Sequence, residues 1–265
     1  MYGAKVFVGL DIGADTSVAC MTDALGVVLA EASIVTSCQA VLDFVACRPM
    51  NNELEIGLEA GSMGILLARR LREQGYQVHL FGTRQASQFL KIRQNKTDTN
   101  DARGIADILR IGRSVVPAVH LKSAAIQQLR SQLVLRQKLV THRVSGEGAI
   151  NSVFRLNGGR LRTSRSGTGL QRNVQAELQR LREIEHIDLA PDVEPLLDIC
   201  VATRRHLESL DRRLSKQAES IPVCARFMEI PGVGPITALS FYTAIEDPWR
   251  FRRNGDVGAY LGLTR

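Results

Sequence analysis

The sequence predicts an α/β fold in which a mixed sheet with flanking helices precedes a long helical arm. Two observations support this prediction. In the first 120 residues, short apolar runs typical of strands alternate with segments of helical apolar spacing. From residue 122 to residue 220, apolar residues recur at helical spacing alone. We therefore expect the sheet and the helices that cover it in the first part of the chain.

Turn residues and apolar spacing place the elements of this first part. Asp23 and Gly26 suit a hairpin turn between two short strands. Strands are expected at residues 4–10, 17–22, 27–30, 54–58 and 76–81, and helices at residues 40–47, 61–74, 84–92 and from 96 to about 111. The order β-β-β-α-β-α-β-α is the one expected of a ribonuclease-H-like domain.

The second part of the chain reads as helices around one loop. Helical patterns cover residues 122–156, 171–185 and 191–220. The first of these is one long amphipathic helix, or two helices interrupted at Gly146 and Gly148. Residues 157–170 are rich in Gly, Ser and Arg and form the clearest predicted loop. We expect an antiparallel helical pair that forms a coiled-coil arm or a dimerisation element.

Composition narrows the classes of protein. The net charge of +7 permits binding to nucleic acid or to an anionic surface. The five cysteines show no CxxC spacing and no nearby histidine, so we expect reduced thiols and no structural zinc. The sequence shows neither a signal-peptide pattern nor an apolar run of the roughly 18 residues that span a bilayer. We expect a soluble, cytoplasmic protein that does not enter a membrane.

Four acidic residues stand where a ligand can reach them. Asp11 directly follows an apolar strand, and Glu59 ends the strand LEIGL. Asp98 and Asp101 lie in one predicted first helical turn, so both project from one face. Carboxylates of this kind are the hard oxygen ligands that suit Mg²⁺ or Mn²⁺. The alternatives are a turn residue at Asp11 and a helix-capping role for Asp98 and Asp101.

The motifs that contain these acids resemble those of one family. VGLDIGADTS, LEAGSMG and KTDTNDARGIADIL are similar to motifs of the DEDD-type insertion-sequence transposases, which have a RuvC-like N-terminal domain. MEIPGVGPITALSFYTAIEDPWRF resembles the start of that family's C-terminal transposase domain. The resemblance implies a RuvC-like DEDD catalytic domain at residues 1–120, a helical arm at 121–222 and an incomplete, helix-hairpin-helix-like domain at 223–265.

The same resemblance implies a function. The implied function is that of a transposase or DNA recombinase, which cleaves and transfers DNA strands with the help of a divalent metal. By position, Asp11, Glu59, Asp98 and Asp101 would be the catalytic acids and would hold Mg²⁺ or Mn²⁺. Double-stranded DNA is one implied partner, and a structured guide RNA is another because the best understood members use a bridge RNA. The arm and the resemblance together imply a homodimer or a higher oligomer.

The family's second catalytic group is a serine, which attacks the DNA backbone and forms a covalent phosphoserine link. In the family it lies beyond the segment that resembles GLTR, where this sequence ends. Ser240 lies in the apolar helical stretch ALSFYTAI and is not assigned that role. We therefore expect a C-terminal truncation and no serine nucleophile in this chain.

Basic residues and glycines are the candidate nucleic-acid contacts. A basic group that precedes the acid pair could guide phosphate toward the metal, and an arginine-rich group surrounds the predicted loop. The motif PGVGP resembles the hairpin of helix-hairpin-helix motifs, whose backbone amides meet phosphate. A solvated loop and an ordinary turn are the alternatives. The candidates are Lys91, Arg93, Lys96, Arg155, Arg160, Arg162, Arg165, Arg172, Gly232 and Gly234.

Two other functions remain open. The chain could be a catalytically inactive remnant that still binds DNA or RNA. It could also be an actin-like or sugar-kinase ATPase, because LDIGADTS resembles the first phosphate loop of that superfold. Such an ATPase needs a second domain of the same kind after residue 120, and it gives the KTDTNDA acids no role.

Overall fold

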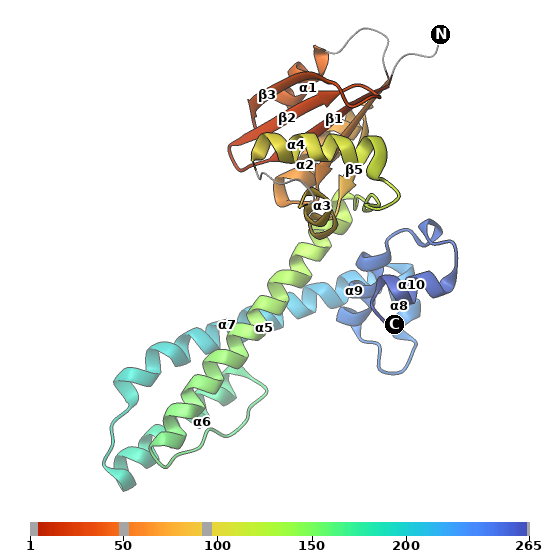
Figure 1. Ribbon diagram of the computed structural model, residues 1–265. Helices are drawn as coiled ribbons and strands as arrows, with labels where there is room; N and C mark the ends of the chain where they lie inside the picture. The colour runs from red at the N-terminus through yellow and green to blue at the C-terminus, as the bar shows by residue number, and fades with distance from the viewer. Residues whose placement is uncertain (1–4, 48–52, 92–96, 264–265) are drawn as a thin grey trace. The chain divides into compact units, whose positions relative to one another are not determined.

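The computed structural model describes residues 5–47, 53–91 and 97–263 (Figure 1). The chain divides into two compact units, Met1–Leu121 and Lys122–Arg265, and each is described by itself. The first unit contains a sheet and helices, whereas the described part of the second contains helices alone. The described residues therefore provide no second α/β domain of the kind that an actin-like ATPase needs.

A five-stranded mixed sheet forms the centre of the first unit. Its strands are β1 (Lys5–Ile12), β2 (Thr16–Thr22), β3 (Val28–Val35), β4 (Glu53–Glu59) and β5 (Gln77–Phe81). Their order in space is β3-β2-β1-β4-β5, with β1, β2 and β3 antiparallel and with β4 parallel to both β1 and β5. The predicted fold class is confirmed. One strand is longer than expected, since β3 pairs with β2 from Val28 as far as Val35.

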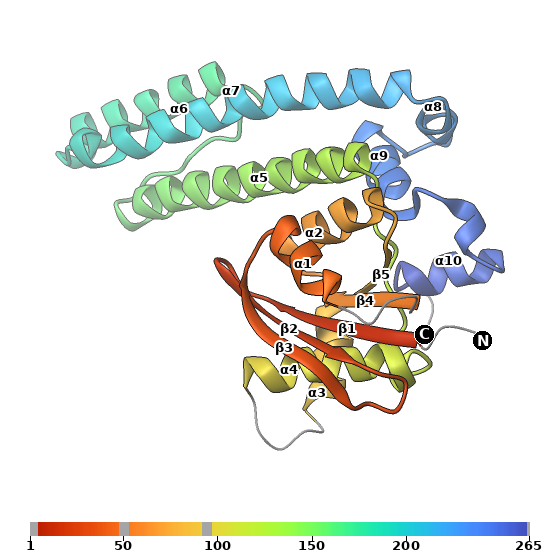
Figure 2. The ribbon, with the colours of Figure 1, turned by 90° about the horizontal axis from the view of Figure 1, so that it is seen from above.

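Helices cover both faces of this sheet, as Figure 2 shows. One face carries α1 (Cys38–Ala46) and α2 (Ser62–Glu73) over a core that includes Val8, Leu10 and Leu58. The other face carries α3 (Thr83–Leu90), α4 (Asp98–Asp107) and the π-helical turn Ile108–Gly112, over a core that includes Phe7 and Phe81. Alternation along β1 explains the two cores, because successive side chains point to opposite faces.

One buried carboxylate lies among cations near the start of β4. Glu55 is 1% exposed, lies 2.7 Å from Lys5 Nζ and 3.0 Å from His79 Nε2, and pairs with Arg113. Burial raises the pKa of the Glu55 carboxyl, but hydrogen bonding by Lys5 and the charges of Arg113 and Lys5 outweigh this and hold the pKa below its usual value. The resulting stabilisation is fully present at pH values above the pKa that the Glu55 carboxyl has in the unfolded chain. It is lost as the pH falls through the lower pKa that this carboxyl has in the folded protein.

The second unit is an arm of long helices with a small helical group at its base. The elements are α5 (Ala124–Leu156), α6 (Gly167–Arg180), the π-helical turn Leu181–Glu185, α7 (Ala190–Ser220), α8 (Pro222–Met228), α9 (Pro235–Ile245), the 3₁₀ turn Pro248–Arg250 and α10 (Asn254–Tyr260). One core includes Phe154, Leu170 and Leu197 of α5, α6 and α7, and another includes Leu214 of α7 and Leu239 of α9. None of the described helices combines the length and apolar character needed to cross a bilayer.

The helix α5 is continuous, which confirms the single long helix and excludes the alternative of two helices interrupted at Gly146 and Gly148. Gly146 faces α7, where an added Cβ would lie 2.6 Å from the Sγ atom of Cys200. The glycine therefore permits close helix packing, and the helix does not end there. The pairs Arg204–Glu147 and Arg136–Asp211 run in opposite directions along the two helices. They show that α5 and α7 are antiparallel, as predicted.

Replacing the buried carboxylate should destabilise the first unit. In Glu55→Gln, Lys5 and Arg113 face a neutral amide. We expect the free energy of unfolding to fall by about 3 kcal/mol near neutral pH, because removing one partner of a buried ion pair costs roughly 3–5 kcal/mol. Urea denaturation followed by circular dichroism measures the change. The control Glu53→Gln, at an exposed position of the same strand, should change the free energy by less than about 0.5 kcal/mol. Equal effects would contradict the role given to Glu55.

Candidate functional site

Asp11 and Glu59 lie at the same edge of the sheet. The parallel strands β1 and β4 pair Gly9 with Gly57 and Leu10 with Leu58, so the two acids follow at matching positions on neighbouring strands. They also project to one face, because each lies two residues after a glycine of the same register pair. Both side chains are half-buried. The expectation that two strand ends bring their acids to one edge thus agrees with the strand register.

Asp98 and Asp101 lie in the first turn of α4. The N-cap of this helix is Thr97, whose hydroxyl accepts a hydrogen bond from the Asn100 amide at 3.2 Å. Asp98 is therefore not the cap of the helix, but as a first-turn acid it still complements the helix dipole, as does Asp101. The Asp98 residue is exposed and the Asp101 residue is half-buried.

The helix α4 packs directly on β1. A Cβ added to Gly9 would lie 2.1 Å from the Ala102 carbonyl oxygen and 2.4 Å from the Ala106 nitrogen. Only glycine allows this approach, because the obstructing atoms belong to backbone that cannot rotate away. The contact places α4 on the face of the sheet to which Asp11 and Glu59 project. Sequence reasoning missed Gly9, although a glycine inside a strand is itself a sign of close backbone approach.

An ion pair across the sheet holds the same helix. Arg103 of α4 donates through two guanidinium nitrogens to the carboxylate of Glu31 on β3. Arg103 hydrogen bonding holds the pKa of Glu31 below its usual value, although burial opposes this. Beneath the pair, burial and the neighbouring Glu31 raise the pKa of the Cys20 thiol to about 12. Cys20 is therefore a protonated, buried thiol and not a nucleophile.

The four predicted acids are placed on one face, but they are not gathered into a metal site. Across residues 5–47, 53–91 and 97–263, no three His, Cys, Asp or Glu side chains lie close enough to hold an ion. The donor chemistry suits Mg²⁺ or Mn²⁺, since all four groups supply carboxylate oxygen. Their assignment as metal ligands stays a prediction.

The basic group before α4 is only partly described. Lys91 is exposed and follows the last residue of α3. Arg93 and Lys96 lie outside the described residues. Their predicted role in guiding phosphate toward the acids stays a prediction.

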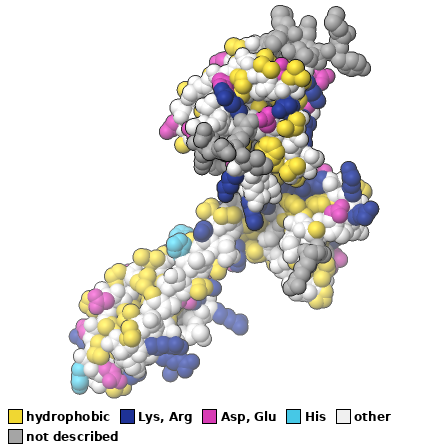
Figure 3. All heavy atoms as spheres, in the orientation of Figure 1, with side chains coloured by type: hydrophobic (Ala, Val, Ile, Leu, Met, Phe, Trp, Pro, Cys, Tyr) yellow, Lys and Arg dark blue, Asp and Glu magenta, His cyan; other side chains and the backbone are white. Residues whose placement is uncertain are grey.

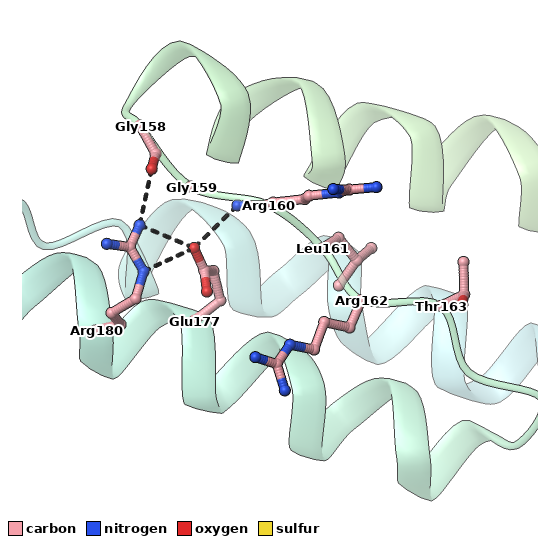
Figure 4. Close-up of a pocket in the computed structure, with 8 residues that line it drawn as sticks. All are labelled: Gly158, Gly159, Arg160, Leu161, Arg162, Thr163, Glu177 and Arg180. Carbon is pink, nitrogen blue, oxygen red and sulfur yellow. Dashed lines mark hydrogen bonds and ion pairs between the residues drawn. The ribbon is translucent and has the colours of Figure 1, made fainter.

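The loop between α5 and α6 is anchored at its start, as Figure 4 shows. Glu177 Oε1 accepts hydrogen bonds from the Arg160 amide at 2.9 Å and from Arg180 Nε at 3.0 Å. Arg180 also donates to the Gly158 carbonyl at 2.9 Å. Burial raises the pKa of Glu177, but the bonds from Arg180 and Arg160 outweigh it and lower that pKa. Gly158 to Thr163, Glu177 and Arg180 surround a hollow of about 600 Å³.

The loop arginines project from this anchored frame. In Figure 4 the Arg160 side chain extends away from the Glu177–Arg180 pair, whereas the Arg162 side chain points back toward it. Neither guanidinium makes a hydrogen bond or salt bridge with a described residue. Arg155 in the last turn of α5 and Arg165 later in the loop are also exposed. The loop therefore holds exposed cations on an ordered backbone, which is an arrangement suited to phosphate.

The PGVGP segment forms a tight turn between two helices. The Val233 amide donates to the Ile230 carbonyl at 3.0 Å, and Gly232 has φ 87°. Proline followed by a glycine of positive φ is the signature of a type II turn. An added Cβ on Gly232 or Gly234 would meet no atom within 4 Å. The helix–turn–helix arrangement of α8 and α9 agrees with the hairpin expected here, while phosphate binding stays a prediction.

The sequence matches two family models and several curated proteins. Residues 8–156 match a DEDD-type model described as Transposase, and residues 224–265 match one described as Transposase IS116/IS110/IS902 family. The chain is 28% identical over 178 residues to the transposase for insertion sequence element IS1111A of Coxiella burnetii, which covers 65% of this chain and 46% of that protein. It is 27% identical over 220 residues to a probable family 20 transposase of Pseudomonas aeruginosa. This match covers 79% of this chain and 60% of that protein. The chain spans about half the length of the curated relatives it matches.

A side chain at Gly9 should loosen α4. In Gly9→Ala, the new methyl group meets the backbone of Ala102 and Ala106, and we expect a loss of about 3 kcal/mol in unfolding free energy. Hydrogen exchange of the α4 amides should accelerate. The control Gly148→Ala adds a methyl group that meets no atom within 4 Å, inside helix α5. It should leave α4 exchange unchanged and stabilise α5 by about 0.5–1 kcal/mol. Unchanged α4 exchange in Gly9→Ala would contradict the packing argument.

Weakening the loop anchor should expose the loop to protease. Glu177→Gln removes the charge that accepts from the Arg160 amide and from Arg180. A loss of about 1–2 kcal/mol should make tryptic cleavage after Arg160 and Arg162 roughly 5–30 times faster. Mass spectrometry of limited digests gives the rates. Glu183→Gln, an exposed change on the following turn, serves as the control and should leave the rates unchanged.

Proposed function

We propose that this chain, which belongs to the IS110 family of DEDD transposases, supplies the acidic part of a site for DNA strand cleavage and transfer. The observation that supports this proposal is the register of β1 and β4, which puts Asp11 and Glu59 side by side at one sheet edge. The matched segments make up 46% and 60% of two curated transposases, so we propose strand transfer only for the whole protein and not for this chain alone.

The metal partner that we propose is Mg²⁺ or Mn²⁺. Asp11, Glu59, Asp98 and Asp101 would hold it, and when bound it would stabilise charge on the attacking and leaving oxygens of a phosphodiester. The chain's own contribution is positional. Gly9 and the Arg103–Glu31 pair keep α4 on the sheet, so that its first turn stays on the face shared with Asp11 and Glu59.

The proposed partners are double-stranded DNA and a structured guide RNA. The exposed loop arginines support phosphate contact, as does the open turn that contains Gly232 and Gly234. We extend the proposal to a homodimer or a higher oligomer, with the arm as the contact element. A reducing cytoplasm suits the five free cysteines of the chain.

A second candidate function is nucleic-acid binding without catalysis. One observation favours it, namely that no three potential ligands lie close enough to hold a metal among the residues that the structure describes. In that case, the acids would keep their positions on the sheet face but would not bind an ion. The two candidates share the basic surfaces and differ only in their response to metal.

Titration with Mn²⁺ separates the two candidates. We expect the wild-type chain to bind Mn²⁺ in calorimetry and Asp11→Asn or Glu59→Gln to weaken this binding at least about tenfold, since each removes one charged ligand. Asp43→Asn, on helix α1, is the control and should bind as the wild type does.

Each outcome supports one candidate. Weakened binding in both site variants, together with Mn²⁺-dependent scission of duplex DNA by the wild type, supports the transposase site. Binding of DNA without metal binding or scission supports the remnant. Unchanged Mn²⁺ affinity in Asp11→Asn would show that Asp11 is not a metal ligand.

A further inference from the structure

A groove on the arm is lined by four arginines and lies apart from the anchored start of the loop. It is formed by α5, α7 and the later part of the loop between α5 and α6, and its volume is about 290 Å³. The apolar side chains Val140 and Leu207 also line it. Figure 3 shows Lys and Arg side chains projecting from the surface of the arm. The charged residues that line the groove are Arg136, Arg143, Arg165, Arg204, Glu208 and Asp211.

Two of these arginines are fixed by acids and form the frame of the groove. Arg204 has a side chain only 7% exposed and donates to both carboxylate oxygens of Glu147 at 2.7 Å. It also donates to the Ser164 carbonyl at 3.0 Å, which ties the loop to α7. Arg136 donates to the two oxygens of Asp211 at 2.6 and 3.2 Å. These two guanidinium groups are occupied within the protein.

The other two arginines have no acid partner among the described residues. The Nε atom of Arg143 is buried and makes no hydrogen bond. Arg165 is exposed, and its guanidinium makes no hydrogen bond or salt bridge within the described chain. A buried donor without an acceptor is unfavourable, so the Arg143 guanidinium gains from any rearrangement that gives it an oxygen acceptor in the groove. The four arginines face three acids, Glu147, Asp211 and Glu208, so the groove keeps a net positive charge. Glu208 forms no salt bridge with a described residue.

We propose that this groove binds a phosphodiester group of a nucleic-acid backbone through Arg143 and Arg165. The inference rests on the proposed function and adds a site to it. Planar guanidinium groups match the paired oxygens of a phosphate, which favours this ligand over a single point anion. The loop argues for a polymer, because an extended run from Arg160 to Arg165 reaches at most about 18 Å and carries exposed arginines at both ends. One strand can therefore contact the loop and the groove together.

The salt dependence of binding tests this site. We would measure fluorescence anisotropy of the full chain with a short duplex DNA and with a hairpin RNA, from about 50 to 200 mM salt. Each lost phosphate contact lowers the slope of log K against log salt by about 0.9 for duplex DNA. Arg143→Gln with Arg165→Gln should therefore lower the slope by about 1–2 and the affinity at least about tenfold. The nucleic acid that shows the loss identifies the ligand as DNA or RNA.

Matched variants keep the test independent of folding. Arg205→Gln with Arg213→Gln removes two exposed arginines of α7 outside the groove, and the slope should change less than in the groove variant. Arg143→Lys with Arg165→Lys keeps the charge and should keep most of the slope. If the glutamine pair unfolds, the exposed single change Arg165→Gln should still lower the slope by about 0.9.

The outcomes separate this inference from the proposed function. If the wild type binds and the groove variant matches the α7 control in slope and affinity, the groove is not a phosphate site and the proposed function stands. If the wild type binds neither DNA nor RNA, the inference and the nucleic-acid part of the proposed function both fail. Loss confined to the groove variant supports the inference.

Discussion

The first unit depends on the contact between the backbone of α4 and Gly9 of β1. The space there is too small for a Cβ atom, so the helix lies closer to the sheet than side chains would allow. Arg103 adds an ion pair to Glu31 two strands away, which restrains rotation of the helix about its axis. The positions of Asp98 and Asp101 relative to Asp11 therefore follow from a packing constraint at residues that carry no chemistry.

The sheet could be predicted from the sequence because its signals are local. Apolar runs and turn residues mark each strand, and an acid at the end of a parallel strand implies an edge position for Asp11 and for Glu59. The features of the fold that could not be predicted depend on contacts between residues far apart in the sequence. The sequence left open whether the long helix is interrupted at Gly146, because the residue that accounts for this glycine is Cys200 of α7. The pairing of Glu31 with Arg103 likewise spans 72 positions of sequence.

In the candidate site, too, some features follow from residues close in sequence and others depend on tertiary contacts. The first-turn positions of Asp98 and Asp101 follow from helix periodicity, and Thr97 as N-cap follows from the local motif. Whether four carboxylates meet around one ion depends on side-chain placement across two layers, which spacing alone does not determine. In the described residues, no three of these acids lie close enough together to hold one ion. Charge repulsion between carboxylates favours such separation until a cation compensates it.

Arginine content alone does not identify a nucleic-acid surface, because pairing decides which arginines are available. Arg204, Arg136 and Arg180 each bond to an acid within the arm and act as structural ties. Arg143 and Arg165 line the same groove as Arg136 and Arg204 but pair with no acid among the described residues. The hydrogen bond from Arg204 to the Ser164 carbonyl fixes the loop backbone next to Arg165, and such order before a ligand arrives lowers the entropy lost on binding. The net charge of +7 counts paired and unpaired arginines alike, and only the tertiary contacts show which arginines are available to a ligand.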